Sequence, residues 1–409
     1  MLSTKFTKNH MQIPWHNFSA DAKTPAIQST LRDKALLVGR IGILMLSCGS
    51  TSWRVRQAMA TAARALQISC IAEIGIITIN YTCFSDDDSI TQALSLDTIG
   101  VNTSRMHAIE QYVKQFTDHY AKQTLEANQK ALDEISQIGE RYSILLLGLA
   151  AAMACAGFMF NLGGGFAEIV CVFVAAGCGN LVRKLCGEFK MSVMIGVVGG
   201  AVTSCLVYAL MMTAARAVFP EIVSFGTGYI GSVLFLVPGF PFITSILDFG
   251  KLDMRSGIER LVYSAIIMSF ATIFCWVSAM IFGLDPGVGE GIVMAGGLRI
   301  VFRLLASFAG VIGFSMIFNS PMKLAVLSGV IGSVANTLRL ELVDRTHISV
   351  VVCAFIGAFL VGILASLAVK ITGYPRAAIT IPAVVVSVPG LFMYRGIYYL
   401  GTGEMGLGI

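Results

Sequence analysis

The sequence predicts an α-helical polytopic membrane protein with about nine transmembrane helices in two inverted repeats, preceded by a small cytoplasmic α+β domain. Three observations predict this fold class. The 409 residues are 56% hydrophobic and only 13% charged, unlike soluble globular proteins. Residues 1–142 carry 27 of the 53 charged side chains (29 Lys and Arg, 24 Asp and Glu). Two similar apolar runs, one mid-chain and one near the end, each contain a Pro-Gly pair.

The front of the chain has the pattern of a flexible tail followed by a folded domain. Residues 1–30 contain Pro14 and Pro25 and have no hydrophobic periodicity, so we expect a flexible tail there. Residues 31–142 alternate helical and β-branched patterns, which indicates a mixed α and β domain. Its expected elements are helices at 31–48, 52–66, 106–116 and 122–138, and a β-hairpin of 71–82 with 89–96 around the acidic turn 86–88.

Nine apolar runs follow, each close to the roughly twenty residues that a helix needs to cross about 30 Å of hydrocarbon. We assign five of them to a first repeat, residues 143–284, and four to a second repeat, residues 285–409. The expected spans are 143–162, 164–182, 191–213, 223–247, 258–283, 292–318, 324–341, 348–369 and 379–400.

The loops between these spans predict the orientation in the membrane, because loops rich in Lys and Arg stay in the cytoplasm. If the N-terminus is cytoplasmic, only Arg216 and Arg345 fall in outside loops, so we expect a multi-pass protein of the bacterial inner membrane with its N-terminus inside. The inside loops then contain Arg183, Lys184, Lys190, Lys251, Arg255, Arg260, Lys323, Lys370 and Arg376.

The Pro-Gly pairs, Pro238-Gly239 and Pro389-Gly390, predict two broken helices. Proline lacks a backbone donor and clashes with the preceding turn, and the freed carbonyls must meet protein or water inside a membrane. Pro238 lies 95 residues after the start of the first span, and Pro389 lies 97 residues after the start of the sixth. Matching interruptions in two halves are the best sequence sign of a transporter's binding site.

Because the first half has five spans, an odd number, the second half is expected to run in the opposite direction through the membrane. On that count a tenth span is expected after the second Pro-Gly pair, and the chain stops at 406–409. This count and glycine-lined helix faces suggest a homo-oligomer as a further hypothesis.

Polar residues behind the two breaks are the first candidates for substrate or ion binding. Thr244 and Asp248 follow Pro238, and Arg395 follows Pro389. A carboxylate retained at membrane depth is usually functional, and burial would make Asp248 a candidate proton carrier. The alternative is a cytoplasmic cap at the end of the span. Arg395 could bind a substrate carboxylate, or its side chain could extend to the membrane interface.

Three further polar residues fall inside or beside predicted spans. Glu168 follows a glycine triplet at the start of the second span, and Asn161 precedes that triplet. Asn336 lies on a small-residue face of the seventh span, where close helix packing is the competing explanation. We take these three residues as additional candidates for substrate binding or coupling.

Enzyme and cofactor motifs are absent from the sequence. Five histidines have no metal-ligand spacing, ten cysteines include no C-x-x-C, and there is no P-loop, G-x-S-x-G or H-E-x-x-H. The basic residues are scattered, which argues against nucleic-acid binding. We therefore expect no metal, no cofactor and no catalysis, but gradient-driven secondary transport of a small molecule through the lipid bilayer.

The string V-P-G-F-P-F-I-T-S-I-L-D at 237–248, with Gly257 and Arg260 beyond it, resembles the motif of the threonine/serine exporter family. Weaker matches are N-L-G-G-G at 161–165 and F-N-S-P at 318–321. The chain departs from the family at Arg56, where members usually have Glu, and at Thr244, where many have Asn. The last span of the family is also not seen.

The resemblance implies proton-coupled export of small polar metabolites, most of all threonine and serine. A split bacterial version of the family is implicated in succinate export, so a dicarboxylate exporter is the first alternative. A membrane scaffold or sensor that does not transport is the second. An amino acid would suit a site with one acid, Asp248 or Glu168, and one base, Arg395.

Overall fold

The computed structural model of the chain describes residues 23–218, 228–284 and 294–387, together with Trp15, Gly390, Tyr394 and Gly396. The chain divides into two compact units. The first unit combines Met1–Glu140 with Pro241–Val262, and the second combines Arg141–Phe240 with Tyr263–Ile409. The first unit thus includes a stretch of chain that the sequence analysis assigns to the first membrane repeat.

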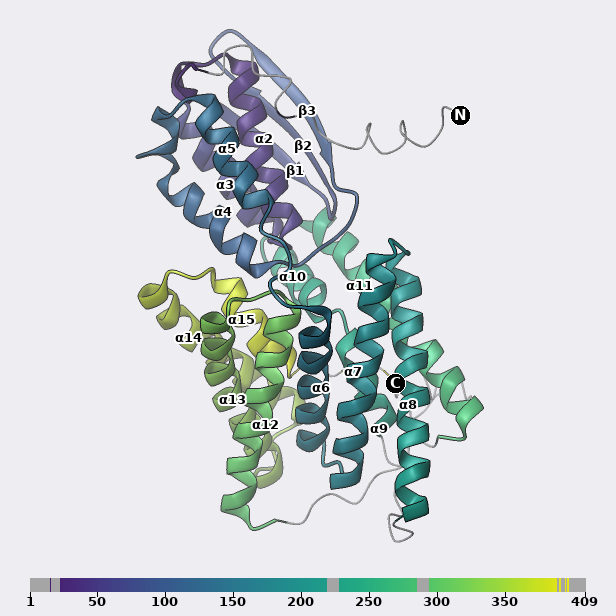
Figure 1. Ribbon diagram of the computed structural model, residues 1–409. Helices are drawn as coiled ribbons and strands as arrows, with labels where there is room; N and C mark the ends of the chain where they lie inside the picture. The colour runs from purple at the N-terminus through teal and green to yellow at the C-terminus, as the bar shows by residue number, and fades with distance from the viewer. Residues whose placement is uncertain are drawn as a thin grey trace, which may run out of the picture. The chain divides into compact units, whose positions relative to one another are not determined.

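The first unit contains a three-stranded antiparallel sheet with helices on one face (Figure 1). Helices α2 and α3 pack on the sheet, α4 packs on both of them, and α5 packs on α2 and α4. Side chains at the preceding residue cap α2, α4 and α5, since Thr30, Asn102 and Thr124 each accept a backbone hydrogen bond. The elements are α2 (Leu31–Ser47), α3 (Ser52–Ala65), β1 (Ser69–Ile74), β2 (Thr78–Phe84), β3 (Ser89–Ser95), α4 (Thr103–Phe116) and α5 (Leu125–Ser136).

All four helices expected in this region are confirmed, and the expected hairpin is confirmed in part. Strands β2 and β3 pair across the acidic turn, with Phe84 opposite Ser89. The run 71–82, expected as one strand, is split because the amide of Gly75 donates to the carbonyl of Thr78 at 2.8 Å. This turn makes β1 a third strand, so the prediction of a two-stranded hairpin was wrong in strand number.

Seven helices of the described residues are long and apolar enough to cross a membrane. They correspond to seven of the nine expected spans. The other two, 223–247 and 379–400, contain shorter helical pieces within the described residues: α9 (Gly228–Val233), the 3-10 turn η4 (Leu234–Leu236), α10 (Gly239–Phe249) and α15 (Arg376–Val385). The seven long helices are α6 (Ile144–Asn161), α7 (Phe166–Glu188), α8 (Val193–Val218), α11 (Met254–Phe282), α12 (Gly296–Ile317), α13 (Met322–Arg345) and α14 (Val350–Thr372).

Helix α6 lies between α7 and α12 in the second unit (Figure 1). Small residues bring α6 and α12 together: a Cβ added at Gly157 would collide with the carbonyl of Ala306, and one at Gly313 with the carbonyl of Ala150. The residue order of these two contacts shows that α6 and α12 are antiparallel. Close approach of backbones at small residues is the usual packing of helices in membranes.

Candidate functional site

The break at the first Pro-Gly pair is confirmed. Residues Leu234–Leu236 form a tight 3-10 turn, and α10 begins at Gly239. Pro238 cannot donate a backbone hydrogen bond, which explains why no continuous helix runs through this position. Helix α15 ends at Val385; the second predicted break, at Pro389, lies outside the described residues, whereas Gly390 is described.

The two interrupted segments contact each other within the second unit. A Cβ added at Gly239 would lie 2.8 Å from Cγ2 of Val385. A Cβ added at Gly390 would lie 3.1 Å from Cδ2 of Leu234 and 3.2 Å from Cγ2 of Val237. Both glycines therefore allow a close approach, and the order of the contacts makes the two segments antiparallel.

A pair of buried tyrosines continues this contact along the same segments. The hydroxyl oxygens of Tyr229, in α9, and Tyr394 lie 3.2 Å apart. Their rings meet edge to face, with centroids separated by 5.9 Å. The contact between the segments thus runs from Tyr229 to Gly239 in the first segment and from Val385 to Tyr394 in the second.

Beside the second segment lies a group of polar side chains that we call the amide cluster: Asn161, Ser307, Asn336, Arg339 and Ser387. The side-chain amides of Asn161 and Asn336 both donate to Ser307 Oγ, at 3.1 and 2.8 Å. Asn336 Oδ1 accepts from Arg339 Nε at 3.1 Å and from Ser387 Oγ at 3.5 Å. The cluster therefore joins the end of α6, the middle of α12 and α13, and the turn after α15.

The amide cluster has hydrogen-bonding capacity that the described residues do not use. Asn161 Oδ1 is buried and has no hydrogen-bond partner among them. The half-buried Arg339 makes no ion pair with any described residue, and only its Nε is engaged in a hydrogen bond. An unpaired acceptor and a guanidinium without a counter-charge can together bind a small molecule that carries an ammonium and a carboxylate.

A second group, the aspartate cluster, lies in the first unit and consists of Ser52, Thr244, Asp248, Ser256 and Arg260. Asp248, which is fully buried, accepts from the Ser52 amide at 2.9 Å, the Ser52 hydroxyl at 3.2 Å and the Ser256 hydroxyl at 2.9 Å. Arg260 Nε lies 3.2 Å from Asp248 Oδ2. Arg260 also donates to Thr244 Oγ1 at 3.1 Å.

The aspartate cluster is saturated with hydrogen bonds. Both carboxylate oxygens of Asp248 are engaged, Oδ1 by the Ser52 amide and Oδ2 by the two serine hydroxyls and Arg260. The side chain of Thr51, the residue before α3, does not cap this helix. The Asp248 carboxylate instead accepts a hydrogen bond from the first amide of α3. The arrangement holds the N-terminus of α3 to α10 and α11.

The remaining candidates of the sequence analysis lie apart from these clusters or outside the described residues. Glu168 is buried at the start of α7, where one carboxylate oxygen accepts from the Gly165 amide at 3.0 Å and the other has no hydrogen-bond partner among the described residues. Arg395 lies outside the described residues. The candidates thus form two pairs, Asn161 with Asn336 and Thr244 with Asp248, that belong to different units.

Sequence reasoning missed Ser307, Arg339 and Ser387. Arg339 carried a usable signal, because a basic residue near the end of an expected span is a functional candidate by default. The two serines carried no signal, since their roles depend on which helices meet. Among the described residues, no group of three or more His, Cys, Asp or Glu side chains is placed to hold a metal ion.

Two family models and several relatives match the chain. A family model described as "Putative threonine/serine exporter" matches residues 36–283, and a second, "Threonine/Serine exporter, ThrE", matches residues 303–409. The chain is 25% identical over 258 residues to the "Probable succinate transporter subunit YjjP" of Klebsiella aerogenes, covering 62% of this chain and 96% of that protein. The Escherichia coli protein of the same name is 22% identical over 246 residues, covering 59% and 92%.

A fungal relative is also similar. "Pheromone-regulated membrane protein 10" of Debaryomyces hansenii is 25% identical over 275 residues, which is 63% of this chain and 26% of that protein. No solved structure matches the chain significantly. Because the first family model covers more than half of the sequence, the chain belongs to the threonine/serine exporter family and is a multi-pass membrane exporter.

Proposed function

We propose that this exporter carries threonine and serine, and that the amide cluster beside the two interrupted segments binds them. The observation that carries the proposal is the meeting of Asn161 and Asn336 on Ser307, next to the contact of the two Pro-Gly segments. Binding sites of secondary transporters lie where interrupted helices of the two repeats meet.

The chemistry of the amide cluster fits a small zwitterion. The guanidinium of Arg339 would bind the carboxylate of an amino acid, and the unpaired Oδ1 of Asn161 would accept from its ammonium. The hydroxyls of Ser307 and Ser387 would bond the hydroxyl of threonine or serine. A site that hydrogen-bonds a substrate hydroxyl rejects analogues that lack it, because its own polar groups would stay unpaired.

Succinate is the second candidate, because two relatives are named as probable succinate transporter subunits. A dicarboxylate carries two negative charges and favours a site with two cationic groups. Among the described members of the amide cluster, Arg339 is the single cation. This charge balance favours the amino acid over succinate.

The antiparallel pairing of α6 with α12, and of one interrupted segment with the other, supports two inverted repeats and a nine-span topology. In each pair one partner comes from 143–284 and the other from 285–409. Equivalent elements that cross antiparallel are expected when the repeats are related by an axis in the membrane plane. The distribution of Lys and Arg supports a cytoplasmic N-terminus and, with bacterial relatives, an inner-membrane location.

We further propose proton coupling through Glu168. A proton carrier must exist in both protonation states, and the free carboxylate oxygen of Glu168 leaves room for a proton. Asp248 is less suited to this role, because Arg260 and three hydrogen-bond donors occupy both of its carboxylate oxygens and leave neither free for a proton. Asp248 then serves transport by holding α3, not by carrying the proton.

The test is efflux from proteoliposomes loaded with radiolabelled threonine, serine or succinate under an imposed pH gradient. We expect threonine and serine efflux that depends on the gradient. Efflux of succinate without either amino acid would overturn the assigned substrate. Efflux that is unchanged when the gradient is collapsed would overturn proton coupling.

Variants locate the site. Asn336→Ala and Arg339→Gln should reduce efflux by about tenfold or more, the effect of losing one or two polar contacts to a bound substrate. Ser269→Ala is the matched control, since its hydroxyl bonds, within the described part of the chain, only a carbonyl of its own helix, at Ala265. Equal rates in all three variants would exclude the amide cluster as the substrate site. Glu168→Gln should retain exchange of substrate but lose its dependence on pH.

A further inference from the structure

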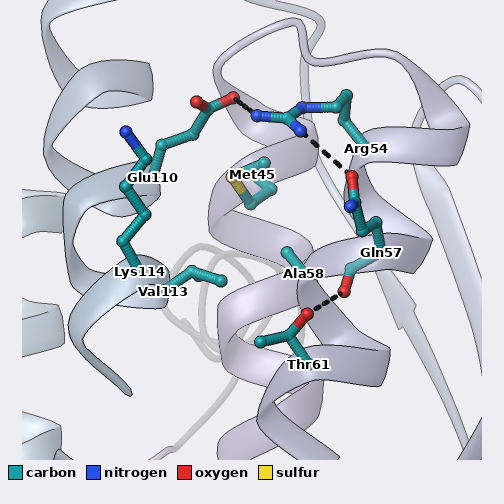
Figure 2. A pocket seen from close by; sticks show the side chains of 8 residues that line it. All are labelled: Met45, Arg54, Gln57, Ala58, Thr61, Glu110, Val113 and Lys114. Atoms are coloured by element: carbon teal, nitrogen blue, oxygen red, sulfur yellow. Dashed lines mark hydrogen bonds and ion pairs between the residues drawn. The ribbon is translucent and has the colours of Figure 1, made fainter. Parts of the chain in front are cut away.

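The first unit contains a pocket of about 200 Å3 between α2, α3 and α4, far in sequence from the amide cluster. Figure 2 shows Arg54, Gln57 and Thr61 of α3 on one wall and Glu110 and Lys114 of α4 on the other. We propose that this pocket is a regulatory site that binds a free α-amino acid. The inference rests on the proposed function in one respect: the amino acid sensed is of the class that the exporter carries.

The charged side chains of the pocket are an ion pair, Arg54 with Glu110, and the ammonium of Lys114, which has no ion pair among the described residues. Arg54 forms an ion pair with Glu110 Oε1 at 2.9 Å and donates to Gln57 Oε1 at 3.0 Å. In the described part of the chain, Lys114 makes no ion pair, and the second oxygen of Glu110 accepts no hydrogen bond. The pocket thus offers an ammonium and a carboxylate oxygen, one helical turn apart on α4, to a ligand.

This pairing selects the class of ligand. The carboxylate of an amino acid would bind the Lys114 ammonium, and its ammonium would bind the free oxygen of Glu110. Met45 and Val113 provide an apolar surface for a short side chain, and the Thr61 hydroxyl provides a polar one. A pocket of about 200 Å3 is smaller than typical drug-sized sites, as expected for a metabolite with few atoms.

The pocket is connected to the aspartate cluster through the first turn of α3. Arg54 lies two residues after Ser52, whose amide and hydroxyl bind Asp248. Arg56, on the same turn, forms an ion pair with Asp253 in the loop between α10 and α11. A ligand that binds Glu110 alters the partner of Arg54, and the same helical turn holds α10 and α11. Occupancy of the pocket can therefore bias the end of α10 and the start of α11.

Trp53 gives a local readout, because the guanidinium of Arg54 lies 5.3 Å from the centre of its ring. The chain has three tryptophans, so the background Trp15→Phe with Trp276→Phe leaves Trp53 as the one emitter. Full-length protein of this background, in detergent, is titrated with L-threonine, L-serine and succinate. We expect a saturable change in emission with the two amino acids.

In the same background, Lys114→Gln and Glu110→Gln should each weaken binding of L-threonine by about tenfold or more. Lys130→Gln, at an exposed lysine of α5, is the matched control and should bind as the background does. No saturable change with either amino acid, or equal affinity in all three variants, would overturn the proposal. A response to succinate alone would overturn the ligand class.

Two measurements separate this inference from the proposed function. If threonine titrates Trp53 but is not exported from proteoliposomes, the substrate assignment fails and the pocket stands. If threonine is exported but does not titrate Trp53, the pocket fails and the substrate assignment stands.

Discussion

The aspartate cluster and the amide cluster differ in how completely their polar groups are hydrogen-bonded. In the aspartate cluster, a buried carboxylate faces a buried guanidinium, and hydroxyl and amide donors complete its hydrogen bonding. In the amide cluster, neutral side chains share one serine hydroxyl, while an acceptor of Asn161 and most donors of Arg339 stay unused among the described residues. Saturated polar groups stabilise a structure, whereas unsaturated ones are available to a ligand.

This difference changes how the family motif is interpreted. Asp248 is the most conspicuous polar residue of the first Pro-Gly segment, and sequence reasoning ranks it first for coupling. Its contacts with Ser52 also hold α3 to α10, and its role in coupling stays a prediction. The hydrogen-bonding groups that stay unused among the described residues belong to Asn161 and Arg339. Sequence alone does not show that these groups are unused, because this depends on which residues surround them.

The largest expected effect comes from breaking the buried pair of the aspartate cluster. Arg260→Gln leaves the Asp248 carboxylate buried without a counter-charge, and removal of one partner of such a pair typically costs about 3–5 kcal/mol. We expect a clear loss of thermal stability of the purified protein, measured by the unfolding temperature in detergent.

The control for this change is Arg255→Gln, since Arg255 is exposed and pairs with Glu73 and Glu259 at the surface. Exposed pairs contribute about 1 kcal/mol or less, so this variant should unfold close to the parent. If Arg260→Gln were as stable as Arg255→Gln, the aspartate cluster would not be a structural connection.

Much of this architecture could be predicted from sequence because it depends on local chemistry. Apolar length predicts the long helices, and the missing donor of Pro238 predicts the break before α10. The strand around Gly75 was misread, because β-branched residues on both sides of the turn look like one run.

The two clusters could not be predicted, since their partners are far apart in sequence. Asn161 and Ser307 are 146 residues apart, and Ser52 and Asp248 are 196 apart. Such contacts depend on how helices pack, and hydrophobic patterns specify a buried face without naming the residue opposite. Arg339 also shows what sequence cannot predict. Its position in a span could be predicted, but the absence of a charged partner among the described residues could not.

A second prediction tests the contact between the interrupted segments. Gly239→Ala places a Cβ 2.8 Å from Val385, and overpacking of this kind costs about 1–3 kcal/mol. Gly390→Ala meets its neighbours at 3.1 Å or more and should cost less. Both effects are measured as shifts of the unfolding temperature.

Two further variants sharpen this test. Gly297→Ala should be tolerated, because among the described residues outside its own turn of helix no heavy atom lies within 4 Å of the added Cβ. Val385→Ala should restore the stability of Gly239→Ala, because it removes the atoms that collide. Equal losses at Gly239 and Gly297, or no rescue, would contradict the close contact of the segments.

A third prediction compares the two arginines directly. Arg339→Gln removes a guanidinium that has no ion pair among the described residues, so stability should change by about 1 kcal/mol or less. The same variant should lose efflux if the amide cluster binds substrate. A loss of stability as large as that of Arg260→Gln would show that both clusters are structural, and the contrast between them would disappear.

The smallest expected effect concerns the pH dependence of the first unit. His107 lies on α4, one turn before Glu110, and its pKa is lowered from the ordinary value of 6.5 chiefly by burial; Glu110 opposes the shift, and Lys114 adds to it. The unfolded chain therefore binds this proton more tightly than the folded one. The stabilising contribution is present above pH 6.5 and is lost as the pH falls through the lowered pKa.

His107→Asn should remove this dependence, so its unfolding temperature should fall less than that of the parent between about pH 7.5 and about pH 5. We expect a difference below about 1 kcal/mol, because the side chain is partly exposed and solvent weakens the shift. His119→Asn, at an exposed histidine after the same helix, is the control. An identical pH slope in parent and His107→Asn would contradict the assignment.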